Sequence, residues 1–401
     1  MMEHGQHRAT GELASVRRTV IVLLALLTFF AWDRIVLAVS LPEISRGIGL
    51  SKPQTGLIAT AFSAGLALVA LPTGILVKRF GFRPALVGGS LLFSAATLYP
   101  PLAHGYADLL ASRILVGLGE GVFHVSLLLY LANLSTKHRA LLIGSASTVY
   151  GLAASVGPPT IQSFNNAMGN WQTSFFVLAA IGVVMCLPLI LFVPATAGRQ
   201  TEASAQPQPI DWNNVLRFWP LLLLIAAQGM TVYSVAGLLP TWLRDYYGFT
   251  GSQAAWSLGA YGLGAMMGGA PMGFVADRVE RRTYLIVMAL VTLASVITLM
   301  TFDLGFLFTI AVAFVFGTFA HSLYVTSIAL AQERAGQDSA VLVGLIATTF
   351  YGFASISGLV LMSATKSLGH PTGALLIYLT AYAVGLGSFQ IFGRKSSAQR
   401  A

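Results

Sequence analysis

An aspartate and an arginine stand side by side, Asp33-Arg34, inside an apolar stretch that runs from about residue 19 to residue 41. A charge at the centre of a lipid bilayer costs at least a few kcal/mol, so an acid and a base at that depth need a compensating role. Such pairs line water-filled pathways, couple ions to transport or contact a substrate. The remaining charged residues indicate which of these roles applies.

A second charged set lies in a later apolar stretch. Arg113, Gly117, Glu120 and His124 follow one another at spacings of four, three and four residues. Residues at these spacings share one face of an α-helix, so we expect a polar face that looks into a helix bundle rather than at lipid. We expect Gly117 to leave room between the charges. Of the fourteen acidic residues, only Asp33 and Glu120 lie deep in apolar stretches.

The two buried carboxylates are predicted to lie at nearly the same depth. Asp33 follows Arg18 by 15 residues, and Glu120 precedes Lys137 by 17 residues. At about 1.5 Å of rise per residue, each carboxylate would sit about 22–26 Å from the basic end of its own helix. Two helices therefore carry one acid each to a common level near the middle of the membrane.

The chemistry predicted for this set is the coupling of protons to an anionic substrate. The protonation of a buried carboxylate depends on how close a guanidinium lies, so movement of the arginine, or its occupation by an anion, would change protonation. We expect Asp33, Glu120 and His124 to carry protons, and Arg34 and Arg113 to bind substrate. The alternative is that the four charged residues are structural ion pairs and that His124 is a satisfied core histidine.

The elements that must position these residues are transmembrane helices. Hydrophobic residues make up 56% of the 401-residue chain and charged residues only 9%, with a mean hydropathy of +0.75, whereas soluble domains carry about 25% charged residues. Apolar runs long enough to cross a bilayer can be placed twelve times, so we predict an all-α polytopic membrane protein with twelve transmembrane helices. The runs lie near 19–41, 54–76, 84–103, 107–131, 140–163, 173–194, 219–241, 254–275, 283–302, 305–331, 341–364 and 374–393.

The distribution of basic residues orients these spans. Twelve spans place both termini on one side, and that side collects seventeen of the 23 Lys and Arg residues, against four on the opposite side. By the positive-inside rule we expect both termini to be cytoplasmic, in a plasma (bacterial inner) membrane. The net charge of +9 then follows from topology and does not indicate a nucleic-acid partner.

The chain also looks duplicated. A polar segment at 195–215 separates two halves that repeat with an offset close to 199 residues, and such duplication places a transport site between the halves near the membrane midplane. The matching residues are Leu41-Pro42 with Leu239-Pro240, Gln54 with Gln253, and Tyr150-Gly151 with Tyr351-Gly352. The predicted organisation is a cytoplasmic tail at 1–18, a six-helix bundle at 19–194, a cytoplasmic linker at 195–218, a second six-helix bundle at 219–393 and a cytoplasmic tail at 394–401.

Two short loops and one helix carry a family resemblance. Gly74-Ile-Leu-Val-Lys-Arg-Phe-Gly-Phe-Arg83 and Gly273-Phe-Val-Ala-Asp-Arg-Val-Glu-Arg-Arg282 resemble the signature loop of the major facilitator superfamily, and the segment from Arg113 to Gly121 resembles its fourth-helix motif. The resemblance covers about 19–393 and implies two pseudo-symmetric six-helix bundles. It also implies a conformational latch formed by Lys78, Arg79, Arg83, Asp277, Arg278, Arg281 and Arg282. Lys78 stands where the family usually carries Asp, so we expect the latch to depend more on Asp277.

Within that superfamily, Asp-Arg in the first span with Gly-x-Gly-Glu in the fourth is similar to the organic-anion symporters and the Spinster-like transporters. In those groups the acids take up protons and the arginines contact anionic substrates. The resemblance also implies that the fifth and eleventh spans line the cavity, where Tyr150 and Tyr351 would offer one hydroxyl from each half. Further lining candidates, for which packing between helices is the alternative, are Gln228, Tyr233, Trp256, Tyr261, His321 and Tyr324.

The sequence lacks the usual marks of an enzyme or a pump. It contains no metal-ligand cluster, no nucleophile with a base at useful spacing and no nucleotide loop, and the single cysteine, Cys186, cannot form an intramolecular disulfide. We therefore predict no catalytic residues, no metal and no cofactor. The predicted function is a monomeric secondary active transporter in the lipid bilayer that carries a small organic anion with protons (symport) by alternating access. The alternatives are a proton-coupled exporter of lipids or amphipathic compounds, and a non-transporting membrane receptor.

Overall fold

The computed structural model describes residues 2–134, 139–193 and 211–398, and these residues form helices and no strands. The helices of the first half are α1 (Met2–Ile48), α2 (Lys52–Thr60), α3 (Phe62–Phe80), α4 (Phe82–Thr97), η1 (Pro100–Leu102), α5 (Tyr106–Leu134), α6 (Arg139–Met168), α7 (Gln172–Val184) and α8 (Cys186–Phe192). Those of the second half are α9 (Trp212–Leu216), α10 (Trp219–Tyr247), α11 (Gly251–Gly268), α12 (Ala270–Ala276), α13 (Arg281–Thr301), α14 (Gly305–Arg334), η2 (Gly336–Asp338), α15 (Ser339–Leu368) and α16 (Thr372–Ala398).

These elements make twelve rods that run through the bundle. The pairs α2–α3, α7–α8 and α11–α12 each form one interrupted rod, because the two helices of each pair together occupy one of the expected spans. Ten stretches of the described residues are long and apolar enough to cross a membrane, and α6 and the α11–α12 rod complete the set. The architecture confirms the predicted all-α polytopic fold with twelve transmembrane helices.

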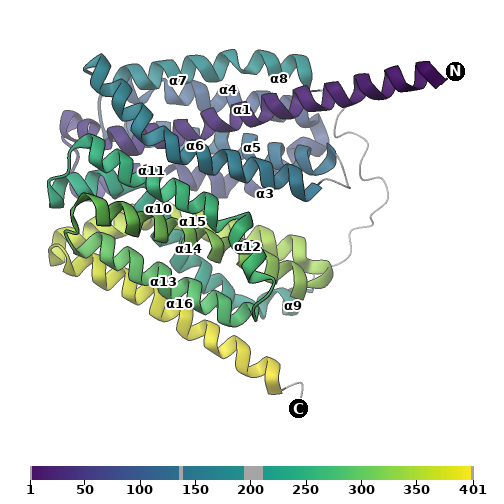
Figure 1. Cartoon of the computed structure of the whole chain (residues 1–401). Coiled ribbons are helices and arrows are strands. Elements are labelled where there is room, and N and C mark those ends of the chain that lie inside the picture. Colours follow the sequence, from purple (N-terminus) through teal and green to yellow (C-terminus); the bar gives the residue numbers. More distant parts are fainter. Residues whose placement is uncertain (1, 135–138, 194–210, 399–401) are drawn as a thin grey trace.

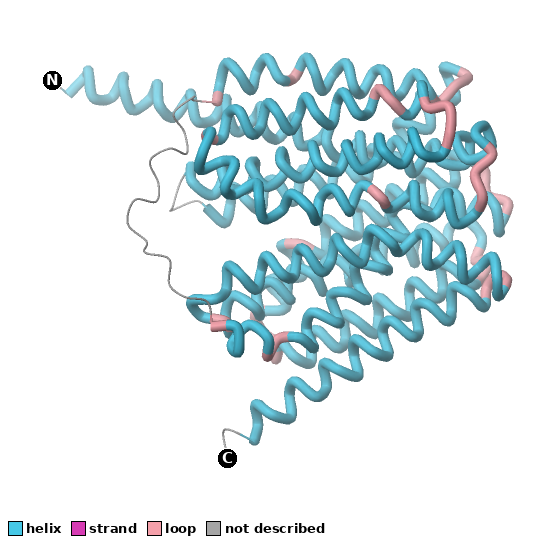
Figure 2. The backbone as a smooth tube through the Cα atoms, turned by 180° about the vertical axis from the view of Figure 1, so that it is seen from behind, coloured by secondary structure: helices cyan, strands magenta, loops and turns pink. Residues whose placement is uncertain are grey.

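The two halves lie one against the other along their length. Figure 1 shows α1–α8 in the upper layer and α9–α16 in the lower layer, and both termini lie at the same end of the bundle, which Figure 2 shows from behind. We call this end the terminal end and the opposite end the distal end. The distal end contains the turns at 49–51, 169–171, 248–250 and 369–371.

The first expected span differs in length from the helix that contains it. The apolar run at 19–41 lies inside α1, which extends from Met2 to Ile48. The run is shorter than the helix because apolar residues are needed only where the helix crosses lipid, whereas backbone hydrogen bonds continue the helix beyond the lipid. The boundaries of the predicted tails, bundles and linker stay predictions. Residues 194–210, which make up most of the predicted linker, lie outside the described residues.

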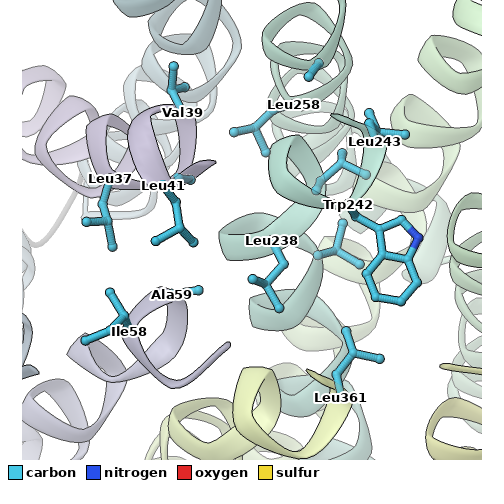
Figure 3. Packing of buried hydrophobic residues seen from close by; sticks show 14 of the residues in the cluster. Leu37, Val39, Leu41, Ile58, Ala59, Leu238, Trp242, Leu243, Leu258 and Leu361 are labelled. Atoms are coloured by element: carbon cyan, nitrogen blue, oxygen red, sulfur yellow. The ribbon is translucent and has the colours of Figure 1, made fainter. Parts of the chain in front are cut away.

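A continuous apolar core seals the distal end between the halves. It joins residues of α1 and α2, such as Leu41 and Ala59, to residues of α10, α11 and α15, such as Leu238, Trp242 and Leu361. Figure 3 shows these two sets of side chains facing each other across the seam. Burial of this apolar surface holds the distal parts of the two halves together.

Glycines bring the helices of the two halves into backbone contact along this seam. A Cβ placed on Gly56 of α2 would lie 2.1 Å from the carbonyl oxygen of Gly358 on α15, and one on Gly259 of α11 would lie 2.5 Å from the carbonyl oxygen of Ser155 on α6. Small residues allow such close approach. The α2–α15 and α6–α11 contacts are therefore closed by backbone against backbone.

Polar contacts also join the two halves. The hydrogen bonds and ion pairs that are described between the halves lie at the centre and the distal end. They are Arg34–Tyr233, Thr60–Ser355, Thr60–Gly358, Lys52–Tyr246 and Glu43–Arg244. The structure is therefore a conformation closed at the distal end.

The duplication is visible in the turns that begin α2 and α11. The backbone N–H of Ser51 donates to Oε1 of Gln54 at 2.9 Å, and that of Thr250 donates to Oε1 of Gln253 at 3.0 Å. Each turn forms a capping box, in which a Ser or Thr and a Gln three residues later satisfy each other's backbone groups. The matched glutamines of the sequence repeat therefore have the same structural role.

Candidate functional site

Arg34 of α1 is the centre of the polar cluster inside the bundle. Its Nη2 donates to Oε2 of Glu120 on α5 at 2.9 Å, and its Nε donates to the same oxygen at 3.2 Å. The side chain of Arg34 is 14% exposed and that of Glu120 is fully buried. This ion pair joins the first and fourth spans, as the structural alternative anticipated.

Arg34 also connects the two halves of the molecule. Its Nη1 donates to the hydroxyl of Tyr150 on α6 at 3.2 Å and to the hydroxyl of Tyr233 on α10 at 3.3 Å. The rings of Phe30 and Phe62 each lie 4.9 Å from its guanidinium carbon, at a distance typical of cation–π attraction. One cation therefore contacts a carboxylate, two hydroxyls and two ring faces contributed by five helices.

Glu120 is only partly satisfied by this arrangement. Its Oε1 is buried and has no hydrogen-bond partner among the described residues, while its Oε2 accepts both bonds from Arg34. A buried ion pair offsets its desolvation only when the remaining hydrogen-bonding groups are satisfied. The ion pair therefore leaves one buried oxygen of Glu120 unsatisfied among the described residues.

Asp33 faces away from this pair, toward α4. It is 3% exposed, its Oδ1 accepts a hydrogen bond from the hydroxyl of Thr97, and its Oδ2 has no partner among the described residues. Arg113 on α5 is 1% exposed, and its Nε and Nη2 also lack described partners. The ring of Phe62 lies 5.2 Å from the guanidinium carbon of Arg113, so this one ring is close to both buried arginines.

Gly117 has a different role from the one that we expected. A Cβ at this position would lie 1.8 Å from the carbonyl oxygen of Phe62. The glycine therefore leaves room for the backbone at the start of α3 rather than for the charges themselves. This close approach is what brings the Phe62 ring to Arg34 and Arg113.

The two histidines do not extend the polar cluster by hydrogen bonds. His124 lies on α5 with its ring 5.3 Å from that of Phe30, and His321 lies on α14 at the point where α11 packs closely through Gly268. Neither ring has a hydrogen-bond partner among the described residues. A proton-carrying role for His124 and a substrate contact for His321 stay predictions.

The other predicted lining residues divide into two groups. Tyr351 joins the cluster, because its ring lies 5.9 Å from that of Tyr233. The rest make no described hydrogen bond to Arg34. Tyr324 packs on Phe350 at 4.5 Å, and the ring of Phe350 lies 5.5 Å from that of Tyr233. Tyr261 packs on Phe316 at 5.7 Å, and Gln228 is fully buried and donates to the backbone of Ala320. Trp256 is 57% exposed. Of the aromatic candidates, only Tyr150 and Tyr233 are hydrogen-bonded to Arg34.

The predicted latch loops lie at the terminal end. Arg281 forms ion pairs with Asp277 at 3.0 Å and with Glu333 at 2.5 Å. Arg282 donates a hydrogen bond to the backbone carbonyl of Gln390 at 3.0 Å. The guanidinium carbon of Arg278 lies 3.5 Å from the centre of the Phe274 ring. Each contact described for residues 277–282 stays within the second half. Lys78 and Arg79 are exposed at the end of α3, where Arg79 lies 5.3 Å from the ring of Phe80, and Arg83 is half-buried at the start of α4. The latch assignment stays a prediction.

Three residues of these sites carried no usable signal in the sequence. Thr97 is one of several hydroxyl residues in an apolar span, Phe62 is one of 24 phenylalanines, and Glu333 lies outside the loop that it holds. Their roles depend on which helices become neighbours.

The central charges balance. Asp33 and Glu120 carry two negative charges when ionised, and Arg34 and Arg113 carry two positive charges, so the fully ionised cluster is neutral overall. A buried net charge in the middle of a membrane costs several kcal/mol.

Comparison with known proteins is consistent with this geometry. A family model described as Major Facilitator Superfamily matches residues 21–359. The chain is 27% identical over 373 residues to the 3-(3-hydroxy-phenyl)propionate transporter of Escherichia coli, a match covering 89% of each chain. It is 24% identical over 286 residues to the probable sulfoacetate transporter SauU of Cupriavidus necator, a match covering 67% of this chain and 66% of that one. A solved bacterial homologue of the human lysosomal transporter Spinster, inward-facing and occupied, has the same fold, with a TM-score of 0.68 at 16% identity over 94% of this chain and 96% of that one.

Proposed function

The chain belongs to the major facilitator superfamily, and on that premise we propose that it moves a small organic anion through the centre of the bundle by alternating access, coupled to protons. Membership of this family of transporters also confirms the prediction that the protein is not an enzyme. Two of its relatives are named for phenylpropionate and sulfoacetate, which are organic anions. These names support the substrate class proposed for this chain.

The observation that carries the proposal is the set of contacts of Arg34. This cation lies at the centre, is hydrogen-bonded to both halves and has a carboxylate, Glu120, as its present partner. A substrate carboxylate or sulfonate offers anionic oxygens that can accept the hydrogen bonds now accepted by Glu120. The substrate therefore competes with Glu120 for one guanidinium.

This competition provides a means of coupling. When the substrate occupies Arg34, Glu120 loses its counter-charge in a buried site, and a carboxylate in that situation is stabilised by taking up a proton. When the substrate leaves, Glu120 returns to Arg34 and releases the proton. The tyrosine hydroxyls of Tyr150 and Tyr233 stay on the guanidinium and hold it in place during the exchange.

Charge balance favours symport over antiport. The four ionised residues of the central cluster sum to zero, so one bound monoanion with one bound proton leaves the site neutral, whereas the anion alone leaves a buried negative charge. Asp33 is a second proton carrier in this proposal, because its Oδ2 has no described partner. One monoanion therefore travels with at least one proton.

The orientation follows from the basic residues. We place the terminal end in the cytoplasm of a plasma (bacterial inner) membrane, since seventeen of the 23 Lys and Arg residues belong to the side of the termini. The distal end then faces the outside and is the closed end in this structure. Outward opening requires the distal seam to separate.

The test is uptake into proteoliposomes that contain a pH-sensitive dye. A substrate added outside should acidify the lumen if it enters with protons, whereas a proton-coupled exporter working as an antiporter would make the lumen more alkaline. A panel of aromatic carboxylates, sulfonates and hexuronates covers the proposed class. A protein that binds these anions without moving any of them would instead be a receptor.

Two variants assign the roles. Glu120→Gln keeps the shape of the side chain but cannot ionise, so substrate exchange across the membrane should persist while accumulation driven by a proton gradient is lost. Arg34→Ala should weaken substrate binding at least tenfold. Lys366→Gln, an exposed cation at the end of α15 outside the central cluster, is the matched charge-removal control. Proton-driven accumulation by Glu120→Gln at the wild-type level would refute the exchange mechanism.

A further inference from the structure

A cavity of about 130 Å³ lies at the distal end, on the seam between the halves. It is separate from the central cluster, and its lining comes from α1, α2, α10 and α15. The polar residues that line it are Ser45, Arg46, Lys52, Thr55, Thr241 and Asp245. One water needs only about 10–15 Å³ on this measure of volume, so the cavity has room for a small organic molecule.

The sequence repeat relates the residues on its two sides. Because Leu41-Pro42 matches Leu239-Pro240, Glu43 corresponds to Thr241 and Arg46 corresponds to Arg244. Oε1 of Glu43 pairs with Arg244 across the seam at 2.6 Å. The symmetry-related ion pair would join a carboxylate at position 241 to Arg46. Position 241 is a threonine, so this second ion pair is missing.

The groups that the missing pair would use are present in the cavity wall. Thr241 is 2% exposed, and its hydroxyl has no hydrogen-bond partner among the described residues. Nε of Arg46 donates to the carbonyl of Pro42 at 3.0 Å, but its Nη2 lies 3.7 Å from Glu43, beyond hydrogen-bond distance. The guanidinium of Arg46 therefore has N–H groups that can donate hydrogen bonds to another acceptor.

The charge in and around the cavity is positive. Arg46, Lys52 and Arg244 are three cations, while Glu43 and Asp245 are two carboxylates, of which Asp245 lies within electrostatic range of all three cations. One positive charge is left without a counter-charge in this group. A bound monoanion would neutralise it.

We propose that this cavity is a binding site for a small monovalent oxyanion, a carboxylate or a sulfonate, which takes the place of the missing symmetry-related carboxylate between Thr241 and Arg46. The hydroxyl of Thr241 and the guanidinium of Arg46 donate to its oxygens. The ammonium of Lys52, which donates to the hydroxyl of Tyr246 at 2.9 Å, adds a second cation. Asp245 excludes dianions by repulsion.

The site has a conformational consequence, because its wall comes from both halves. Arg46 and Lys52 belong to the first half, and Thr241 and Asp245 belong to the second. The site exists only while the distal seam is closed. A ligand that binds one conformation stabilises it over the other, so the anion favours the distally closed state and slows outward opening.

The test is thermal unfolding of the purified protein in acetate and in methanesulfonate, each against chloride at equal ionic strength. Both oxyanions should raise the unfolding midpoint of the wild type above that in chloride. Arg46→Gln should weaken the apparent affinity for acetate at least tenfold. Thr241→Glu supplies the missing carboxylate, so it should raise the midpoint in chloride and lose the response to acetate. Lys366→Gln, a cation of the same distal side that is absent from the cavity wall, should respond like the wild type.

A parallel variant separates this site from the central one. Arg34→Ala removes the central anion contact and should keep the full acetate response of the distal cavity. Loss of the response in Arg34→Ala, its persistence in the Arg34→Ala/Arg46→Gln double variant, or equal unfolding midpoints of the wild type in acetate and chloride would each overturn the proposal. Thr241→Val removes only the unpartnered hydroxyl and should weaken acetate binding even if Thr241→Glu does not fold.

Discussion

Alanine at Gly358 should weaken the distal seal. The added Cβ would lie 2.0 Å from the carbonyl oxygen of Gly56, whereas ordinary contacts begin at 3.4 Å. Both atoms belong to helix backbone, so no rotamer change relieves the clash, and α2 and α15 must move apart by more than about 1 Å. Overpacking of this kind costs about 1–3 kcal/mol. Since 1.4 kcal/mol is a factor of ten in an equilibrium, the ratio of distally closed to distally open protein should fall about 5- to 150-fold.

The opening can be followed by the reactivity of a cysteine in the seam. Thr241→Cys suits this purpose, because Thr241 is 2% exposed and its hydroxyl makes no described hydrogen bond. The native Cys186 is replaced by serine, which leaves one reactive thiol. When opening is fast relative to labelling, the rate of reaction with a membrane-impermeant maleimide follows the open fraction and should rise with Gly358→Ala.

A second glycine of the same helix provides the control. Gly352 also lies in α15, but a Cβ there would meet no atom within 4 Å. Gly352→Ala therefore brings the same gain in helix propensity, about 1 kcal/mol, without the clash. If Gly358→Ala folds and labels Thr241→Cys no faster than Gly352→Ala does, the glycine crossing does not hold the seam closed.

Three further outcomes are expected. Asp33→Asn should retain substrate exchange but lose proton-driven accumulation, as measured by uptake with and without a pH gradient; wild-type accumulation would remove Asp33 from the coupling network. Gly117→Ala should lower the thermal midpoint strongly, because its Cβ would meet the backbone of α3 at 1.8 Å, while Gly88→Ala, with no atom within 4 Å, should not. Hydrogen bonds donated by Thr283 hold the pKa of the exposed Glu280 below its usual value. This stabilisation is present above the unfolded pKa of about 4.3 and is lost as the pH falls through the folded pKa. Glu280→Gln should therefore lower the midpoint of thermal unfolding slightly at neutral pH and leave it unchanged in acid. An effect that does not depend on pH would contradict this.

Composition and periodicity were enough to predict the fold class. A chain with so few charges must satisfy its backbone within lipid, and the helix is the element that does so within one segment. The spacing of Arg113 and Glu120 predicted that both lie on a face turned away from lipid, and both are buried in α5. The matched residues Gln54 and Gln253 predicted a repeat that the two capping boxes bear out.

The pairing of the charges could not be predicted in this way. Asp33, Arg34 and Glu120 lie at similar depths on two helices, and Arg113 lies two turns from Glu120, so several pairings are compatible with the sequence. The rotation of α1 and α5 about their axes directs Arg34 to Glu120 and Asp33 to Thr97. Rotation depends on packing against all neighbouring helices, and no single segment encodes it.

The sequence by itself determined that this chain is a duplicated membrane bundle with acids and bases buried at its middle, because hydropathy, charge asymmetry and internal repeats are local properties of the chain. Only the tertiary structure decided that Arg34 joins both halves, that Phe62 reaches both arginines and that the distal seam is closed over a basic cavity. These features depend on contacts between segments up to about three hundred residues apart, such as Thr60 and Ser355. Close packing, which a pattern along one segment cannot express, selects those contacts.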